Sequence, residues 1–314
     1  MPDFDRRLPG RGLEALDRLA SNRIGWWPDL LANWAPSGSS GGLRVAIRDG
    51  TLNFYEKGQS IARVTFGRDG NRPTMSIHQK YVKESNEDGQ KYIKLMEAEG
   101  SDKDGRSVSW GGSTMLQEWI RRSSDYRGPE KRCIDSLVGC SPKVIDLEMG
   151  LPAFNERNTA LRMDLVSLEV KSNDLYLTFW EAKMIGNSGL RSSIGKPEVF
   201  EQINAYRLYL ADRDRRQRVA EAYINCCKII CKFHKMASRL GMPHSIDPLI
   251  KAAACADSMN VEEIPRLVVF DNCDPHREEV WQNHLKVLRS KVSVAIVDKQ
   301  SQGMPIESIP RFGG

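Results

Sequence analysis

Long hydrophobic runs are missing from this sequence. No stretch approaches the roughly 18 consecutive apolar residues that a membrane-spanning helix needs. The opening residues, MPDFDRRLPGRG, contain no apolar core of a secretion signal. We therefore expect a cytoplasmic protein with no membrane partner. The 314 residues are 40% hydrophobic and 28% charged, a composition typical of soluble globular proteins.

Several catalytic signatures are also absent. The sequence contains no H-E-x-x-H, no G-x-S-x-G and no G-x-x-x-x-G-K-S motif. These absences argue against a zinc protease, a serine hydrolase and a P-loop NTPase. Any ATP-driven motor that works with this protein would therefore be a separate chain.

The seven cysteines include no C-x-x-C pair, which argues against a zinc ribbon or a thioredoxin-like motif. Three of them lie in the segment NCCKIICKF, which has the pattern of a buried helix: Cys226, Cys227 and Cys231. We interpret them as small apolar core side chains, with an iron–sulfur or metal site as the alternative. Reduced cysteines fit the cytoplasm. A net charge of +5 permits a nucleic-acid partner but does not demonstrate one.

Changes in hydrophobic periodicity divide the chain. Leucines at helical spacing precede the linker PSGSSGG, two-residue alternation follows, and a Gly/Ser-rich stretch at 99–113 marks a boundary. We predict a helical arm and linker at 1–42, an antiparallel β module at 43–100, an α/β domain at 112–300 and a C-terminal tail at 301–314. In the β module we expect Arg44, Arg48 and Arg63 to face solvent, with a phosphate-contacting surface as the alternative.

The α/β domain is expected to alternate helices and strands. The predicted helices cover 114–138 (with a break at Gly128-Pro129), 197–212, 216–240, 245–257 and 276–290. The predicted strands cover 144–149, 161–170, 174–184, 266–271 and 292–298.

Two of these strands bring acidic residues together. The turn formers Lys171-Ser172-Asn173-Asp174 place Val170 opposite Leu175, and this register sets Asp164 opposite Glu181. Lys183 lies two residues beyond Glu181 and therefore on the same face. Two adjacent carboxylates repel unless a positive charge lies between them, and oxygen ligands suit Mg²⁺ or Mn²⁺. The alternative is a buried Glu181–Lys183 ion pair with Asp164 uninvolved.

A second E-x-K sequence lies at the other end of the strand pair. Glu169-Val170-Lys171 adjoins the turn, and no aspartate is expected opposite it. We predict that its charges are exposed at the end of the strand.

The helix after these strands adds a glutamine and a tyrosine. Gln202 and Tyr206 are four residues apart and share a helix face. Asp164, Glu181-Ala182-Lys183 and Gln202-x-x-x-Tyr206 together resemble the PD-(D/E)XK nuclease superfamily, in its RecB-like branch. The resemblance covers roughly residues 114–298. It implies a restriction-endonuclease-like mixed sheet flanked by helices and metal-dependent hydrolysis of phosphodiesters.

The resemblance also implies roles for individual residues. Asp164 and Glu181 would bind the metal, and Lys183 would position or activate the attacking water. Gln202 and Tyr206 would contact substrate or support the site. Met163 departs from the family pattern, which often has proline before the aspartate, but the ligand set is unchanged.

Further residues complete the expected site. The family uses an additional glutamate, for which Glu148 is our first choice and Glu130 the alternative. Arg191 and Lys196, in the loop NSGLRSSIGKPE, could bind phosphates or simply face solvent.

These inferences predict a nuclease that acts on DNA with Mg²⁺ or Mn²⁺. By the same resemblance, its context would be genome defence or repair, with a separate motor or defence-system protein as a partner. RNA as the substrate, a catalytically silent nucleic-acid-binding or scaffolding protein, and an oligomeric state are all compatible with the sequence.

Overall fold

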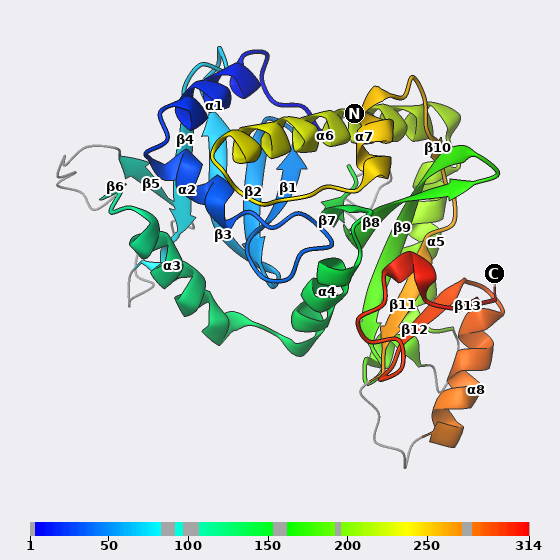
Figure 1. The fold of residues 1–314 in the computed structure, drawn as a ribbon. Coiled ribbons are helices and arrows are strands. Elements are labelled where there is room, and N and C mark those ends of the chain that lie inside the picture. The colour runs from blue at the N-terminus through cyan, green and yellow to red at the C-terminus, as the bar shows by residue number, and fades with distance from the viewer. Residues whose placement is uncertain are drawn as a thin grey trace.

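The structure is a computed structural model that describes residues 4–82, 92–96, 107–152, 162–191, 196–271 and 278–313. Parts of the predicted 99–113 boundary, residue 161 and residues 276–277 lie outside the described residues. The described chain is α/β, with two mixed sheets flanked by helices (Figure 1). The helices are α1 (Gly12–Ser21), α2 (Trp26–Asn33), α3 (Ser113–Arg122), α4 (Pro129–Cys140), α5 (Glu198–Leu210), α6 (Arg213–Arg239), α7 (Pro248–Cys255) and α8 (Glu278–Arg289).

The first sheet has the order β1-β2-β3-β4-β5-β6. Its strands are β1 (Arg44–Arg48), β2 (Thr51–Glu56), β3 (Gln59–Phe66), β4 (Pro73–His78), β5 (Tyr92–Met96) and β6 (Ser107–Ser109). The antiparallel meander is confirmed from β1 to β5, and Gly50, with a φ of 61°, makes the first turn. The β5–β6 pair is parallel, so this sheet is mixed and not wholly antiparallel.

The second sheet has the order β13-β12-β11-β9-β8-β7, with β10 beside β9. Its strands are β7 (Val144–Gly150), β8 (Arg162–Lys171), β9 (Asp174–Met184), β10 (Asn260–Val261), β11 (Arg266–Phe270), β12 (Val294–Val297) and β13 (Arg311–Phe312). Strands β7, β8 and β9 are antiparallel, whereas β9, β11 and β12 are parallel. Residues 301–314, predicted as a tail, supply β13, which pairs with β12.

The register of the β8–β9 hairpin agrees with the prediction. Val170 pairs with Leu175, and the ladder continues to Leu165 opposite Trp180, so the next pair is Asp164 and Glu181. Ser172 and Asn173 adopt positive φ angles of 48° and 72°, which make the two-residue turn.

Helix α6 ties the two sheets together, because it runs across the first sheet and reaches β10 beside the second (Figure 1). On the first sheet, Trp27 of α2 is fully buried, with its ring centroid 6.2 Å from that of Phe54 and 5.2 Å from that of Phe233 of α6. Cys226 and Cys227 are buried in the same helix, as predicted. One hydrophobic core is therefore shared by the arm, the first sheet and the second sheet.

The predicted linker at 36–42 packs against α4, where the Gly38 N–H donates to the Val138 carbonyl at 2.9 Å. No helix among the described residues is long and apolar enough to cross a membrane.

The prediction that Arg44 and Arg48 face solvent is wrong. Arg44 is 3% exposed and pairs with Asp135 of α4 at 3.3 Å, while Arg48 pairs with Asp146 of β7 at 2.7 Å. Arg63 is half-buried, with its guanidinium over the Tyr92 ring. Helix α4 and strand β7 supply these carboxylates from about a hundred residues further along the chain, which a local sequence pattern cannot show.

Candidate active site

Asp164 and Glu181 meet where regular pairing between β8 and β9 ends. The carboxylate of Asp164 is buried, and its Oδ2 accepts a hydrogen bond from the Ala182 N–H at 2.9 Å. Its Oδ1 lies 3.0 Å from the Nζ of Lys131. Both oxygens of Asp164 are thus fixed by neighbouring groups.

Glu181 is the least satisfied acidic group of this cluster. It is 2% exposed, its Oε1 contacts the Lys183 ammonium, and its Oε2 is buried with no hydrogen-bond partner within the described part of the chain. Burial raises the pKa of Glu181 to about 7; the Asp164 carboxylate adds to this rise and Lys183 opposes it. A buried carboxylate oxygen without a donor is costly, so this position favours an added cation or proton.

Lys183 is present as an ammonium at neutral pH. Burial by itself would lower the pKa of Lys183, but the Glu181 and Asp164 carboxylates outweigh it and raise that pKa above its usual value. The side chain can therefore donate hydrogen bonds and stabilise negative charge. It is poorly suited to accept a proton in this state.

Lys131 is a site residue that the sequence analysis missed. It lies on α4, and its Nζ contacts both the Glu148 carboxylate and Asp164 Oδ1. The turn between β2 and β3 covers its stem, since a Cβ on Gly58 would lie 2.7 Å from Lys131 Cγ. One weak signal for Lys131 is its position directly after Glu130, a candidate site residue. Only the packing of α4 and the first sheet brings it to β8.

The two candidates for the additional glutamate lie on different sides of the site. Glu148 adopts a positive φ of 51° in β7 and binds Lys131 and Arg162, the latter at 3.3 Å. Glu130 opens α4, and its Oε2 accepts from the Met184 N–H at 3.4 Å. Its charge also raises the pKa of Glu181. Glu148 thus belongs to the Asp164–Lys131 side and Glu130 to the Glu181–Lys183 side.

The expected set of three carboxylates is not drawn together as one ligand group. Among the residues that the structure describes, no three or more His, Cys, Asp or Glu side chains are arranged to hold a metal ion. Asp164 and Glu181 are adjacent, while Lys131 occupies the space between Asp164 and Glu148.

Tyr206 supports the site from α5. It is buried, and its hydroxyl donates to the Met149 carbonyl of β7 at 3.0 Å. Burial, together with the charges of Glu181 and Asp164, raises the pKa of Tyr206 above its usual value. Of the two roles considered for Tyr206, this geometry favours support. Gln202 lies one turn earlier on α5 and is half-buried.

The predicted phosphate-binding residues flank a partly described loop. Arg191 is half-buried, and its guanidinium donates to the Asn187 carbonyl at 3.5 Å. Lys196 is exposed, just before α5. Residues 192–195 of this loop lie outside the described residues.

The prediction that Glu169 is exposed is wrong. Glu169 is 7% exposed, and Arg266 of β11 binds both of its oxygens, at 2.6 and 3.0 Å. Arg311 of β13 adds a third contact at 2.7 Å. Lys171 pairs with Glu262. These partners lie about a hundred or more residues along the chain and reach Glu169 through the strand order of the second sheet.

Comparisons with protein-family models, with curated proteins and with solved structures found no match to this chain.

Proposed function

We propose that this chain is a divalent-metal-dependent nuclease that hydrolyses phosphodiester bonds in DNA on a restriction-endonuclease-like fold. The observation that carries the proposal is the buried Glu181 Oε2, which has no donor in the described chain, beside Asp164 and the Lys183 ammonium. Most buried polar atoms in folded proteins have a hydrogen-bond partner, so a buried carboxylate oxygen without one, next to a second carboxylate, favours an added cation or proton.

The residues present fit a hard divalent cation. Glu181 Oε2 offers a buried oxygen that has no hydrogen-bond partner among the described residues, and the Asp164 carboxylate lies across the strand pair. Carboxylate oxygens are ligands that Mg²⁺ and Mn²⁺ prefer. Asp164 and Glu181 would hold the ion, with Glu130 or Glu148 at its edge. When bound, such an ion lowers the pKa of water and neutralises charge on a phosphate oxygen.

The chain's own groups would orient the reaction. Lys183 donates hydrogen bonds from a fixed ammonium, which suits positioning a water molecule and stabilising charge that develops on the phosphate. The hydrogen bond from the Ala182 N–H holds the Asp164 carboxylate in place, and Tyr206 fixes α5 against β7. These supports keep the two carboxylates preorganised.

The resemblance noted in the sequence carries the rest of the proposal. It suggests a place in genome defence or repair, beside a separate motor or defence-system protein. DNA is the substrate that it favours, with RNA as the alternative that the experiment must separate.

A cleavage assay tests the proposal. Linear duplex, circular duplex, single-stranded DNA and RNA are incubated with the protein in Mg²⁺, Mn²⁺ or EDTA. We expect cleavage of DNA that EDTA abolishes. Cleavage that persists in EDTA, or cleavage of RNA alone, would contradict the proposal as stated.

One observation favours a second candidate, a catalytically silent nucleic-acid-binding or scaffolding protein. Lys131 already forms ion pairs with both Asp164 and Glu148, and Arg162 forms a second one with Glu148. If those ion pairs are permanent, the site is structural. Nucleic-acid binding without Mn²⁺ binding or cleavage would support this candidate.

A further inference from the structure

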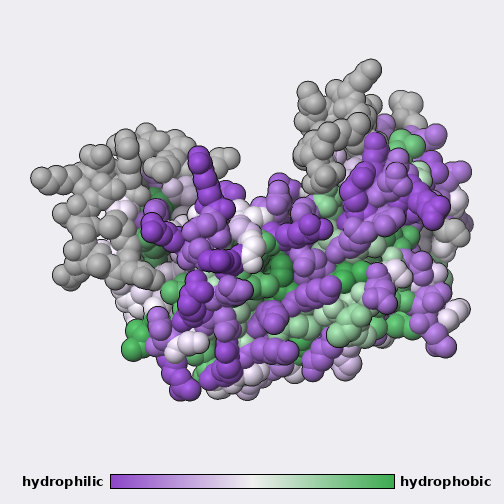
Figure 2. All heavy atoms as spheres, turned by 90° about the horizontal axis from the view of Figure 1, so that it is seen from above, coloured by the Kyte–Doolittle hydropathy of each residue, from purple (hydrophilic) through white to green (hydrophobic). Residues whose placement is uncertain are grey.

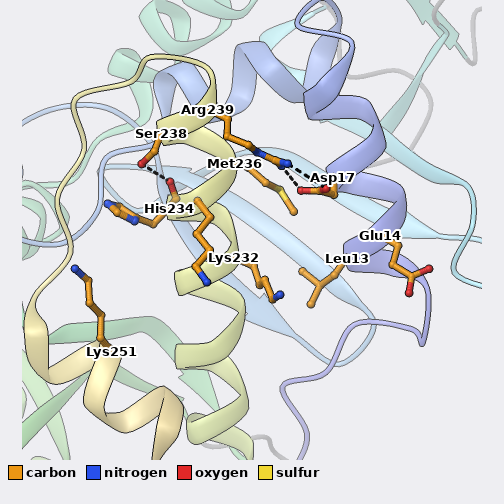
Figure 3. A pocket seen from close by; sticks show the side chains of 10 residues that line it. Leu13, Glu14, Asp17, Lys232, His234, Met236, Ser238, Arg239 and Lys251 are labelled. Atoms are coloured by element: carbon orange, nitrogen blue, oxygen red, sulfur yellow. Dashed lines mark hydrogen bonds and ion pairs between the residues drawn. The ribbon is translucent and has the colours of Figure 1, made fainter.

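A broad groove lies between the C-terminal half of α6, α1 and α7, away from the carboxylate site. Figure 3 shows the side chains that line it, and its volume is about 810 Å³. Seen from above, the face formed by these helices is largely hydrophilic, with apolar patches between the polar side chains (Figure 2). We refer to this feature as the α6 groove.

Positive charge dominates the α6 groove. The exposed face of α6 carries basic residues at intervals of four, three and four positions: Lys228, Lys232, Lys235 and Arg239. Lys251 of α7 adds a further charge on the opposite wall.

The acidic residues of the groove are few and lie on the α1 wall. Asp17 is engaged by Arg239, as Figure 3 shows, and Glu14 points away from α6 in the same view. Within the described residues, Lys232, Lys235 and Lys251 form no ion pair. Three uncompensated ammonium groups therefore converge on one groove, which favours an anionic ligand.

The shape of the row favours an extended polyanion. From Lys228 to Arg239 the helix rises about 16 Å, the axial length of about five base pairs of duplex DNA. Among the described residues, the lining includes no Phe, Tyr or Trp side chain on which an unpaired base could stack. We propose that the α6 groove binds the sugar–phosphate backbone of duplex DNA. The choice of DNA over other polyanions rests on the proposed function.

Helix α6 links the groove rigidly to the candidate active site. Tyr223 of α6 donates a hydrogen bond to the Asp146 carboxylate at 2.8 Å. Asp146 belongs to β7 and lies two residues before Glu148. Lys232 lies nine residues further along, about 14 Å by helix rise. DNA held in the groove would thus be anchored at a fixed separation from β7.

Duplex binding in EDTA tests this proposal apart from catalysis. Fluorescence anisotropy follows a labelled 20-base-pair duplex over a series of salt concentrations. The full chain is compared with K232Q/K235Q/K251Q and with the matched control K286Q/K291Q/K299Q, whose three lysines are exposed elsewhere. We expect the groove variant to bind at least about tenfold more weakly, with its salt slope lowered by about 2.7, and the control to change much less.

Four results would overturn the proposal. The first is unaltered duplex binding by the groove variant, the second is an equal loss of binding in both variants, and the third is no duplex binding by the wild type. The fourth is competition by poly-L-glutamate as effective as by duplex DNA, which would indicate an acidic protein partner. The outcome is separable from that of the proposed function. Groove-dependent binding without cleavage would refute only the nuclease, and cleavage with unaltered binding by the groove variant would refute only the groove.

Discussion

The strand pair β8–β9 carries two charged clusters, one around Glu169 and one around Glu181. Each contains a buried glutamate, but the two glutamates differ in their partners and in the direction of their pKa shifts. Near the hairpin turn, Glu169 is bound by Arg266 and Arg311, and these arginines lower the pKa of Glu169 against the effect of burial. At the far end, Glu181 contacts Lys183 through one oxygen, its other oxygen is buried without a partner in the part of the chain that the structure describes, and its pKa is raised to about 7.

The contrast shows how to separate a structural ion pair from a chemical site. Both clusters contain the E-x-K sequence, and both glutamates are buried. In the first, arginine side chains donate to both carboxylate oxygens of Glu169, so that carboxylate needs no further partner. In the second, the charges are incompletely compensated, which is the condition for binding a cation.

The largest difference between the two clusters is expected in the rate of DNA cleavage. Lys183→Ala should reduce DNA cleavage at least about a thousandfold, because it removes the ammonium that we propose stabilises charge on the phosphate. Lys171→Ala, the equivalent change in the cluster around Glu169, should leave the cleavage rate nearly unchanged. Initial cleavage rates of the two variants are measured with Mg²⁺ on the same duplex. Equal reductions in rate would refute the distinction between a catalytic and a structural cluster.

The next difference is in stability. Arg266→Ala should lower the free energy of unfolding by about 3 kcal/mol, because it leaves Glu169 buried without its main partner. Arg162→Ala, at an exposed ion pair with Glu148, should cost less than about 1 kcal/mol. Urea unfolding monitored by circular dichroism measures both. If Arg266→Ala lowers the free energy of unfolding only slightly, the cluster around Glu169 does not stabilise the fold.

The pH dependence of stability should also distinguish Glu181. Its carboxyl ionises near pH 7 when folded and near its ordinary pKa of 4.5 when unfolded, so the unfolded chain releases this proton first. The wild type should therefore lose stability, by an amount on the order of 2 kcal/mol, as pH rises from about 4.5 to 7. In EDTA, Glu181→Gln should lack this component, whereas parallel pH curves for the two proteins would contradict the assignment.

The smallest effect is expected at Lys131. Its ammonium would repel a cation bound between Asp164 and Glu181, so Lys131→Met should bind Mn²⁺ about tenfold more tightly. Calorimetric titration measures the change, with Lys57→Met as a control on the neighbouring hairpin. Weaker binding by Lys131→Met would instead assign Lys131 a supporting role.

Local patterns in the sequence predict much of the fold. The turn at Ser172-Asn173 determines the β8–β9 register and so the pairing of Asp164 with Glu181. The strands near 266–271 and 292–298 and the long helix near 216–240 are likewise found within a few residues of the expected positions.

The rest depends on contacts between distant segments. Lys131 reaches Asp164 only because α4 packs beside β8, and Arg266 reaches Glu169 only because β11 is inserted next to β9. Arg44 and Arg48 are buried for the same reason, since their carboxylate partners lie about a hundred residues away in α4 and β7. Burial of a charged side chain is decided by its partners, and periodicity does not identify them.

Mn²⁺ binding tests the difference between the two clusters most directly. Titration of the metal-free protein, followed by electron paramagnetic resonance, should show a Mn²⁺ site that is lost in Asp164→Asn and Glu181→Gln. The same site should persist in Lys171→Ala. If the wild type binds no Mn²⁺, or if Asp164→Asn binds it equally well, Glu181 Oε2 does not mark a metal site and the nuclease proposal fails.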